Sequence, residues 1–167
     1  MREAPEDPET GQLLPPPKGY KRVEALDTRD DMSKDYLSQF NSSFKLLATD
    51  LVFFHHALEH LTRNARIFSM SRGSALVVGG SGAGKQSLTR LAAFICSAQL
   101  FHSTVTPTHN ATNLLDDFKP LDRRAGAQGK SAVYLLTDKE IKDEGFLEYV
   151  NIFLNTGELP NLFTRDE

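Results

Sequence analysis

The feature that most constrains the fold of this chain is a glycine-rich loop between an apolar run and a helix-forming run. The apolar run covers residues 75–78, and residues 87–95 have the composition of a good helix. A strand, a glycine loop and a helix in this order are typical of a phosphate-binding loop, or P-loop. The loop reads Gly79, Gly80, Ser81, Gly82, Ala83, Gly84, Lys85, Gln86.

Each part of this loop suits a polyphosphate. Glycine tolerates positive φ and has no Cβ, so successive backbone amides can curl toward an anion. The helix that starts near Lys85 adds the dipole of its N-terminus, and the Lys85 ammonium suits the β- and γ-phosphates of a nucleotide. We therefore expect ATP or ADP to bind to Gly79, Gly80, Ser81, Gly82, Ala83, Gly84, Lys85, Gln86 and Ser87.

The residue after the lysine departs from the usual pattern G-x-x-x-x-G-K-[ST]. A hydroxyl at that position normally binds Mg²⁺, but the chain has Gln86 there. Gln86 reaches a metal only through an amide oxygen on a longer arm, and Ser87 points about 100° further round the helix. Nucleotide binding is thus predicted more strongly than hydrolysis, and the candidate Mg²⁺ ligands are Gln86, Ser87 and Asp138.

A second acidic element is expected at the end of a neighbouring strand, where the chain reads Thr137-Asp138 in place of the usual Asp-Glu pair. In one alignment Asp138 is the Mg²⁺ ligand and Lys139 stands at the catalytic base. In the other, Thr137 replaces the metal ligand and Asp138 replaces the base. Asp138 and Thr137 are therefore the candidate catalytic residues, with a cap role for Asp138 left open. The sequence does not place the nearby acid Glu140.

From residue 74 onward, predicted strands alternate with predicted helices. This alternation indicates an α/β fold with a parallel sheet flanked by helices on both faces. Three strands fall short of the roughly five in a complete core of this kind, so we expect a core that is incomplete at its C-terminus. The predicted strands are 74–78, 100–105 and 131–136; the predicted helices are 85–99, 111–123 and 143–155, the last capped by Gly157.

The N-terminal part of the chain has a different composition. Residues 1–34 hold five of the eight prolines and many acidic groups, so they bury too little apolar surface to offset the entropy of ordering. We expect a disordered or extended linker arm there, with or without a docking role. Residues 35–70 are expected to form a helical segment before the core, and residues 71–167 the partial core.

Residues 35–68 are predicted to be helical because apolar side chains recur at steps of three and four. Asp50 is expected near the start of the regular part, where a negative charge suits the helix dipole. His56 and His60 share a helix face, but no carboxylate or cysteine cluster completes a metal site, so we expect ordinary histidines. The apolar stripe consists of Leu47, Leu51, Phe54, Leu58, Leu61 and Ala65.

Composition argues against several classes of protein. The 19 basic and 22 acidic residues give a net charge of −3, and no basic face stands out for nucleic acid. No apolar run reaches the ~18 residues needed to cross a membrane. Cys96 is the only cysteine, which excludes an intrachain disulfide, favours an intracellular site and suggests a small buried residue. We expect no nucleic-acid partner and no membrane partner.

Residues 84–92, Gly-Lys-Gln-Ser-Leu-Thr-Arg-Leu-Ala, resemble the fourth AAA+ module of axonemal dynein heavy chains. The glutamine after the lysine is similar to that family, whereas residues 80–83 differ from its usual loop. Residues 51–61 resemble the helix before the module, and residues 137–163 resemble its second-acid strand and the helix that follows. Residues 125–130, the end of the chain and the acidic arm are most similar to the outer-arm gamma type.

This resemblance implies a ring of six AAA+ modules that moves on microtubules and bends cilia or flagella. Its first module does the main hydrolysis, while the fourth binds nucleotide in a regulatory role. The implied partners are neighbouring AAA+ modules of the same heavy chain, microtubules, and dynein intermediate and light chains. The implied location is the cytoskeleton of the cytoplasm and the axoneme of a cilium or flagellum. The chain would hold only the start of that module, so motor activity is expected of the parent protein.

Three other interpretations stay open. In the first, the bound nucleotide is a structural cofactor between modules and is never hydrolysed. In the second, the chain is a truncated dynein fragment with no stable fold and no function. In the third and weakest, the chain is a small P-loop kinase, although no substrate-binding lid is visible in its sequence.

Overall fold

The computed structural model describes residues 26–103, 111–141, 144–160 and 162–163. Its helices and strands alternate from α3 onward, as the sequence predicts. In chain order the elements are α1 (Leu26–Ser43), a 3₁₀ turn (Lys45–Leu47), α2 (His55–Phe68), α3 (Lys85–Ile95), β1 (Gln99–His102), α4 (Ala111–Asp122), a π-helical turn (Arg123–Ala127), β2 (Ala132–Leu135) and α5 (Glu144–Thr156).

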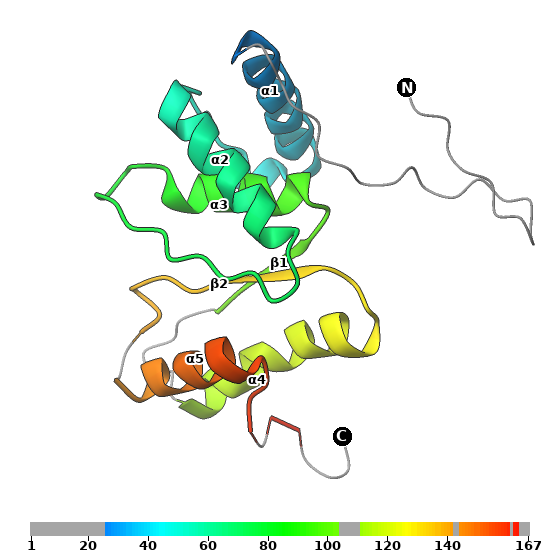
Figure 1. The fold of residues 1–167 in the computed structure, drawn as a ribbon, viewed down its shortest axis with the longest axis vertical. Coiled ribbons are helices and arrows are strands. Elements are labelled where there is room, and N and C mark those ends of the chain that lie inside the picture. The colour runs from blue at the N-terminus through cyan, green and yellow to red at the C-terminus, as the bar shows by residue number, and fades with distance from the viewer. Residues whose placement is uncertain (1–25, 104–110, 142–143, 161, 164–167) are drawn as a thin grey trace, which may run out of the picture.

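Two parallel strands divide the helices into two layers. β1 pairs with β2 in a register that places Gln99 opposite Ala132 and His102 opposite Leu135. Figure 1 shows α1, α2 and α3 on one side of this pair, and α4 and α5 on the other. The α/β class and the parallel sheet between helices are therefore confirmed. Among the described residues no helix is long and apolar enough to cross a membrane.

The first helical layer packs around α3. Leu91 and Ala92 of α3 are fully buried, and Leu61 of α2 is almost fully buried. Phe40 of α1 meets Phe94 of α3 edge to face, with ring centroids 5.6 Å apart. Burial of each such large side chain contributes roughly 1.5–3 kcal/mol. This cluster fixes α3, and with it the end of the glycine loop.

The second layer packs α4 and α5 against the strands. Leu114 of α4 and Phe146 of α5 are buried in its centre. Phe118 of α4 stacks on Tyr134 of β2 at a centroid distance of 4.4 Å. The Tyr134 hydroxyl also pairs with the hydroxyl of Ser103, which follows β1. The aromatic stack and the hydroxyl pair together tie both strands to one helical layer.

Burial raises the pKa of the Tyr134 phenol to about 12, with smaller contributions from the negative charges of Asp117 and Glu140. Between about pH 10 and 12 the native phenol keeps a proton that the unfolded chain releases, so stability falls as pH rises through this window. In the Tyr134→Phe variant we expect that fall to be smaller by up to about 2 kcal/mol. Urea titrations at pH 9.5 and 11.5 measure this fall in the free energy of unfolding. Tyr149→Phe is the matched control, and an equal fall in both variants would contradict the prediction.

The predicted strand at residues 74–78 is wrong. Residues 73–80 form neither helix nor strand and pair with no described strand, and Leu76 and Val78 are 92% and 84% exposed. An apolar run becomes a strand only where a neighbouring strand bonds its backbone groups. Here β1 and β2 pair with each other, and residues 74–78 pair with neither of them. The described sheet consequently has two strands instead of the three predicted.

The predicted continuous helix over residues 35–68 is also wrong. α1 begins at Leu26 and ends at Ser43, so it includes residues 26–34 of the predicted arm. The Asn41 side chain both accepts from the Thr49 N–H and donates to the Thr49 carbonyl, each at 3.0 Å. These bonds hold the connection between α1 and α2, which includes the 3₁₀ turn and in which Asp50 is exposed and starts no helix.

The helices around the strands agree well with their predictions. α4 and α5 match their predicted ranges to within about a residue, whereas α3 stops at Ile95, four residues early. Gly157 caps α5 as predicted, with φ +78° and its N–H donating to the Phe153 carbonyl at 2.8 Å. Cys96 is half-buried, and its thiol donates to the Ala65 carbonyl at 3.2 Å. Residues 1–25 of the predicted arm and the last two residues of the predicted strand 100–105 lie outside the described residues.

Candidate nucleotide site

The glycine loop has the backbone conformation that its sequence predicts. Gly82 and Gly84 adopt φ of +77° and +74°, a left-handed region that residues with a Cβ rarely occupy. A Cβ added to Gly80 or Gly82 would meet no atom within 4 Å. The space beside these two glycines is thus open to a ligand, and their positive φ lets consecutive amides turn toward it.

The start of α3 supplies further hydrogen-bond donors. Gly84 is the N-cap residue, and no side chain caps the helix. The first backbone N–H groups of an α-helix have no partner inside the helix, and together with the dipole they favour an anion. In this chain that end of α3 directly follows the glycine loop. The donor set therefore fits a phosphate group.

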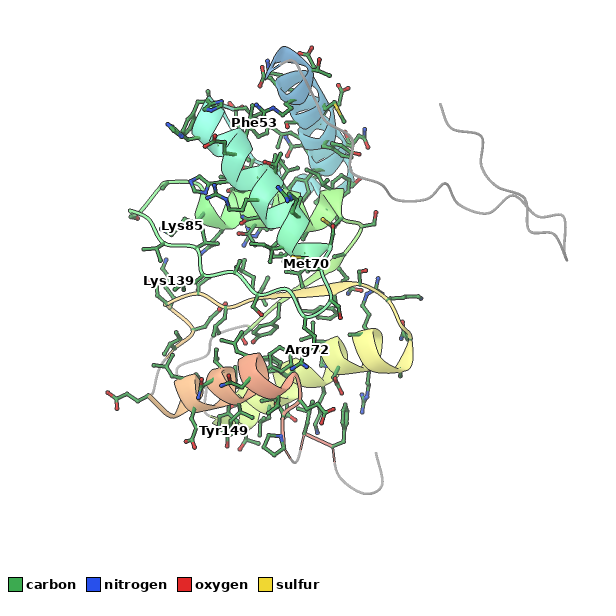
Figure 2. All side chains as sticks on the ribbon, viewed as in Figure 1. Phe53, Met70, Arg72, Lys85, Lys139 and Tyr149 are labelled. Atoms are coloured by element: carbon green, nitrogen blue, oxygen red, sulfur yellow. The ribbon has the colours of Figure 1, made fainter. Side chains whose placement is uncertain are left out.

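Lys85 lies at the centre of this site. Its ammonium donates hydrogen bonds to the Gly79 carbonyl at 2.5 Å and to the Gly80 carbonyl at 2.7 Å. The aliphatic part of the side chain lies under Gly79, whose added Cβ would be 3.6 Å from Lys85 Cδ. The lysine is thus folded over its own loop, and phosphate oxygens can replace the two carbonyls as acceptors. Figure 2 shows it at the start of α3.

Leu51 contacts this loop, although nothing in the sequence pattern predicts it. A Cβ on Gly84 would lie 3.8 Å from Leu51 Cδ2, so the connection between α1 and α2 reaches the P-loop. Leu51 also lines an open groove of about 570 Å³ beside α1. The predicted apolar stripe placed Leu51 on a continuous helix and so did not indicate this contact. In the structure Leu51 lies between the end of α1 and the start of α2. The groove is lined by Lys34, Leu37, Ser38, Asn41, Ser42, Asp50 and Leu51.

The candidate Mg²⁺ ligands come from two places in the fold. Gln86 is exposed and Ser87 is half-buried in the first turn of α3. Asp138 is exposed beyond the end of β2. Carboxylate, amide and hydroxyl oxygens suit Mg²⁺, and the carboxyl ends of parallel strands are where α/β proteins bind ligands. Within the described part of the chain no hydrogen bond or ion pair joins Asp138 to the loop.

The segment after β2 is a tight turn. The Glu140 N–H donates to the Thr137 carbonyl at 3.0 Å, which leaves Asp138 and Lys139 as the two central residues of a β-turn. Both central residues are exposed, whereas Glu140 is buried. The structure thus places Glu140, which the sequence could not. Its burial depends on a turn that only the three-dimensional arrangement reveals.

Two histidines of α2 contact a carboxylate, and the described residues contain no cluster that could hold a metal ion. His55 Nε2 and His56 Nδ1 lie 3.1 and 3.4 Å from the two oxygens of Glu59. The hydrogen bond from His56 and the nearby positive charges lower the pKa of Glu59. Since all three side chains are exposed, these contacts are ordinary ion pairs on a helix surface and contribute little to stability.

The chain has a parallel sheet between helical layers. Its glycine loop has left-handed residues and leads into a helix that no side chain caps and that begins with a lysine. These features define the class of P-loop α/β proteins. The family described as "P-loop containing dynein motor region D4" matches residues 49–167. The chain belongs to this dynein motor family.

Individual relatives agree with the family match. The chain is 46% identical over its whole length to human dynein axonemal heavy chain 8. It is 45% identical over 90% of its length to rat dynein axonemal heavy chain 5. It is 38% identical over 89% of its length to the dynein beta chain of the flagellar outer arm of Chlamydomonas reinhardtii. The chain spans 3–4% of the length of these relatives.

Proposed function

We propose that this chain is the nucleotide-binding part of the fourth AAA+ module of an axonemal dynein heavy chain. The observation that carries the proposal is the phosphate cradle: positive φ at Gly82 and Gly84, no side-chain cap on α3, and Lys85 over the loop. In this cradle the loop amides and the first amides of α3 bind the phosphates of ATP or ADP. The Lys85 ammonium neutralises their charge.

In this proposal the module regulates the motor more than it powers the motor by hydrolysing ATP. Gln86 replaces the hydroxyl that normally binds Mg²⁺, and Thr137-Asp138 replaces the usual acidic pair. Both departures fall on the metal side of the site, while the phosphate cradle keeps its geometry. A base misplaced by ~1 Å can cost about 10²-fold in rate. A second candidate function, in which the nucleotide is held and never hydrolysed, is favoured by the same two departures.

The proposed parent is an outer-arm heavy chain of the gamma type that acts on microtubules in the axoneme of a cilium or flagellum. Support comes from relatives that are named axonemal heavy chains and, in one case, a flagellar outer-arm chain. Neighbouring AAA+ modules of the same chain complete the ring, and dynein intermediate and light chains bind the parent protein. These partners belong to a much longer protein than the 167 residues here.

Equilibrium titration of the complete protein with a fluorescent ATP analogue tests this function. We expect saturable binding at this module that ATP and ADP displace and that adenosine does not, because the cradle binds phosphates. In the other modules of the ring the P-loop lysines are replaced, so that the signal comes from this site alone. Equal displacement by adenosine, or no saturable binding, would contradict the proposal.

A further inference from the structure

The turn that follows β2 is closed by the side chain of Glu140 as well as by the backbone. Glu140 Oε2 accepts the Thr137 N–H at 2.5 Å, and the Glu140 N–H donates to the Thr137 carbonyl at 3.0 Å. Thr137 therefore exchanges two hydrogen bonds with Glu140. Both ends of the turn are fixed to each other, and its two central residues, Asp138 and Lys139, form the exposed tip.

Glu140 is an unusual residue to find in this position. Its exposed fraction is 7%, and glutamate is rarely buried without a specific partner. A buried carboxylate is costly unless hydrogen-bond donors compensate for its lost hydration. Here the backbone N–H of Thr137 is such a donor. The turn and the carboxylate thus depend on each other, and loss of the carboxylate leaves a backbone amide without its acceptor.

The direction of Asp138 depends on this clamp. Asp138 follows β2 by three residues, at the end of the strand where α/β proteins bind their ligands. Figure 2 shows Lys139, its neighbour in the turn, and Lys85 toward the same side of the view. A free four-residue segment would sample many backbone angles, and fixing each residue costs conformational entropy. The clamp meets this cost within the folded protein, before any ligand binds.

We propose that Glu140 is a positioning residue that fixes the Thr137–Glu140 turn so that Asp138 meets the Mg²⁺ of a bound nucleotide. The inference rests on the proposed nucleotide site. Glu140 acts through the backbone of Thr137 and touches neither metal nor phosphate. Its role requires the reach of a glutamate side chain and a hydrogen-bond acceptor at its end, whereas a negative charge is not required.

Two conservative variants separate the length of the Glu140 side chain from its charge. Glu140→Gln keeps the length and an acceptor oxygen but removes the charge. Glu140→Asp keeps the charge but shortens the arm by one methylene. The measured quantity is the Mg²⁺ concentration that gives half of the metal-dependent change in fluorescence of a bound ATP analogue, in the complete protein. Affinity for the analogue in EDTA is measured alongside, and thermal unfolding checks that each variant folds.

We expect Glu140→Asp and Glu140→Ala to weaken the apparent Mg²⁺ affinity about tenfold, as loss of outer-shell partners does in metal sites. Asp138→Asn should weaken it by at least as much. Glu140→Gln should stay within about twofold of wild type, as should the control Glu148→Gln, since Glu148 is an exposed residue of α5. Affinity in EDTA should stay unchanged in all of them, because the phosphate cradle is intact.

Three results would overturn the inference while leaving the nucleotide site standing. The first is a Glu140→Asp variant with wild-type Mg²⁺ affinity. The second is a Glu140→Gln variant as weak as Glu140→Ala, which would show that the charge acts directly. The third is a wild-type Mg²⁺ affinity in Asp138→Asn. A wild-type protein that binds no nucleotide would instead overturn the proposed function, and this inference with it. If Glu140→Ala does not fold, the Asp and Gln variants decide.

Discussion

Replacing Gly73 by alanine is expected to lower the free energy of unfolding by about 3 kcal/mol. The new Cβ would lie 2.0 Å from the carbonyl oxygen of Ile67 and 2.9 Å from its carbonyl carbon. Both are backbone atoms of α2, so a side-chain rotation cannot relieve the contact. The Ile67 carbonyl also accepts the Met70 N–H at 3.0 Å, and Gly73 donates to Met70 at 3.3 Å. The whole turn after α2 would have to move.

This turn also carries a long-range contact. Arg72 has a φ of +56°, and its guanidinium donates to the Asn155 carbonyl of α5 at 3.3 Å. It lies so close to Gly157 that a Cβ there would be 2.7 Å from Arg72 Nε. Figure 2 shows Arg72 over this second layer. A shift at Gly73 would therefore loosen the contact between α5 and the turn that leads from α2 to the glycine loop.

Urea titration monitored by circular dichroism measures the effect of Gly73→Ala. Gly80→Ala is the matched stability control, because its Cβ would meet no atom within 4 Å; its unfolding free energy should stay within about 0.5 kcal/mol of wild type. If the unfolding free energy of the Gly73 variant also stays within about 0.5 kcal/mol of wild type, the close approach of Gly73 to the Ile67 carbonyl of α2 is contradicted.

Local pattern predicted the helices around the strands, because their stability depends on an apolar face that is visible in sequence. α4 and α5 bury Leu114 and Phe146 on such faces, and Gly157 stops α5 through its own φ. The start of α1 could not be predicted in this way. Its first turns are rich in charge, and Asp30 and Lys34 form an ion pair at 2.5 Å within it. The apolar contacts of α1 come later, at Leu37 and Phe40.

What the sequence could not predict depends on partners elsewhere in space. The run Leu76–Val78 has the composition of a strand but pairs with no described strand, so it stays outside the sheet with its side chains exposed. The conformation of the glycine loop could be predicted because its glycines, helix and lysine are adjacent in sequence. Leu51 and Glu140 could not, since a broken helix brings the first to Gly84 and a turn buries the second.

Replacing Lys85 by alanine is expected to weaken ATP binding at this module by about 10- to 100-fold. The ammonium would form charge-assisted hydrogen bonds with phosphate oxygens, which contribute roughly 1.5–3 kcal/mol to binding. In the described structure the same ammonium donates to the carbonyls of Gly79 and Gly80, so the variant also loses two bonds within the loop. A melting curve for each variant separates this change in the loop from the change in affinity.

Lys130→Ala is the matched control for Lys85→Ala. Lys130 is an exposed lysine in the connection before β2 and is outside the phosphate cradle, so its replacement removes the same charge from the protein. We expect its ATP affinity to stay within about twofold of wild type. A similar loss in both variants would indicate a general effect of net charge, which acts weakly and is screened by salt.

The most direct test of the central claim, that the loop at 79–87 binds a nucleotide through its phosphates, is the dissociation constant of ATP for wild type, Lys85→Ala and Lys130→Ala. All three are measured in one buffer by competition with a fluorescent analogue. The claim predicts a loss of about 10- to 100-fold in Lys85→Ala alone. An unchanged dissociation constant in a folded Lys85→Ala protein would contradict it.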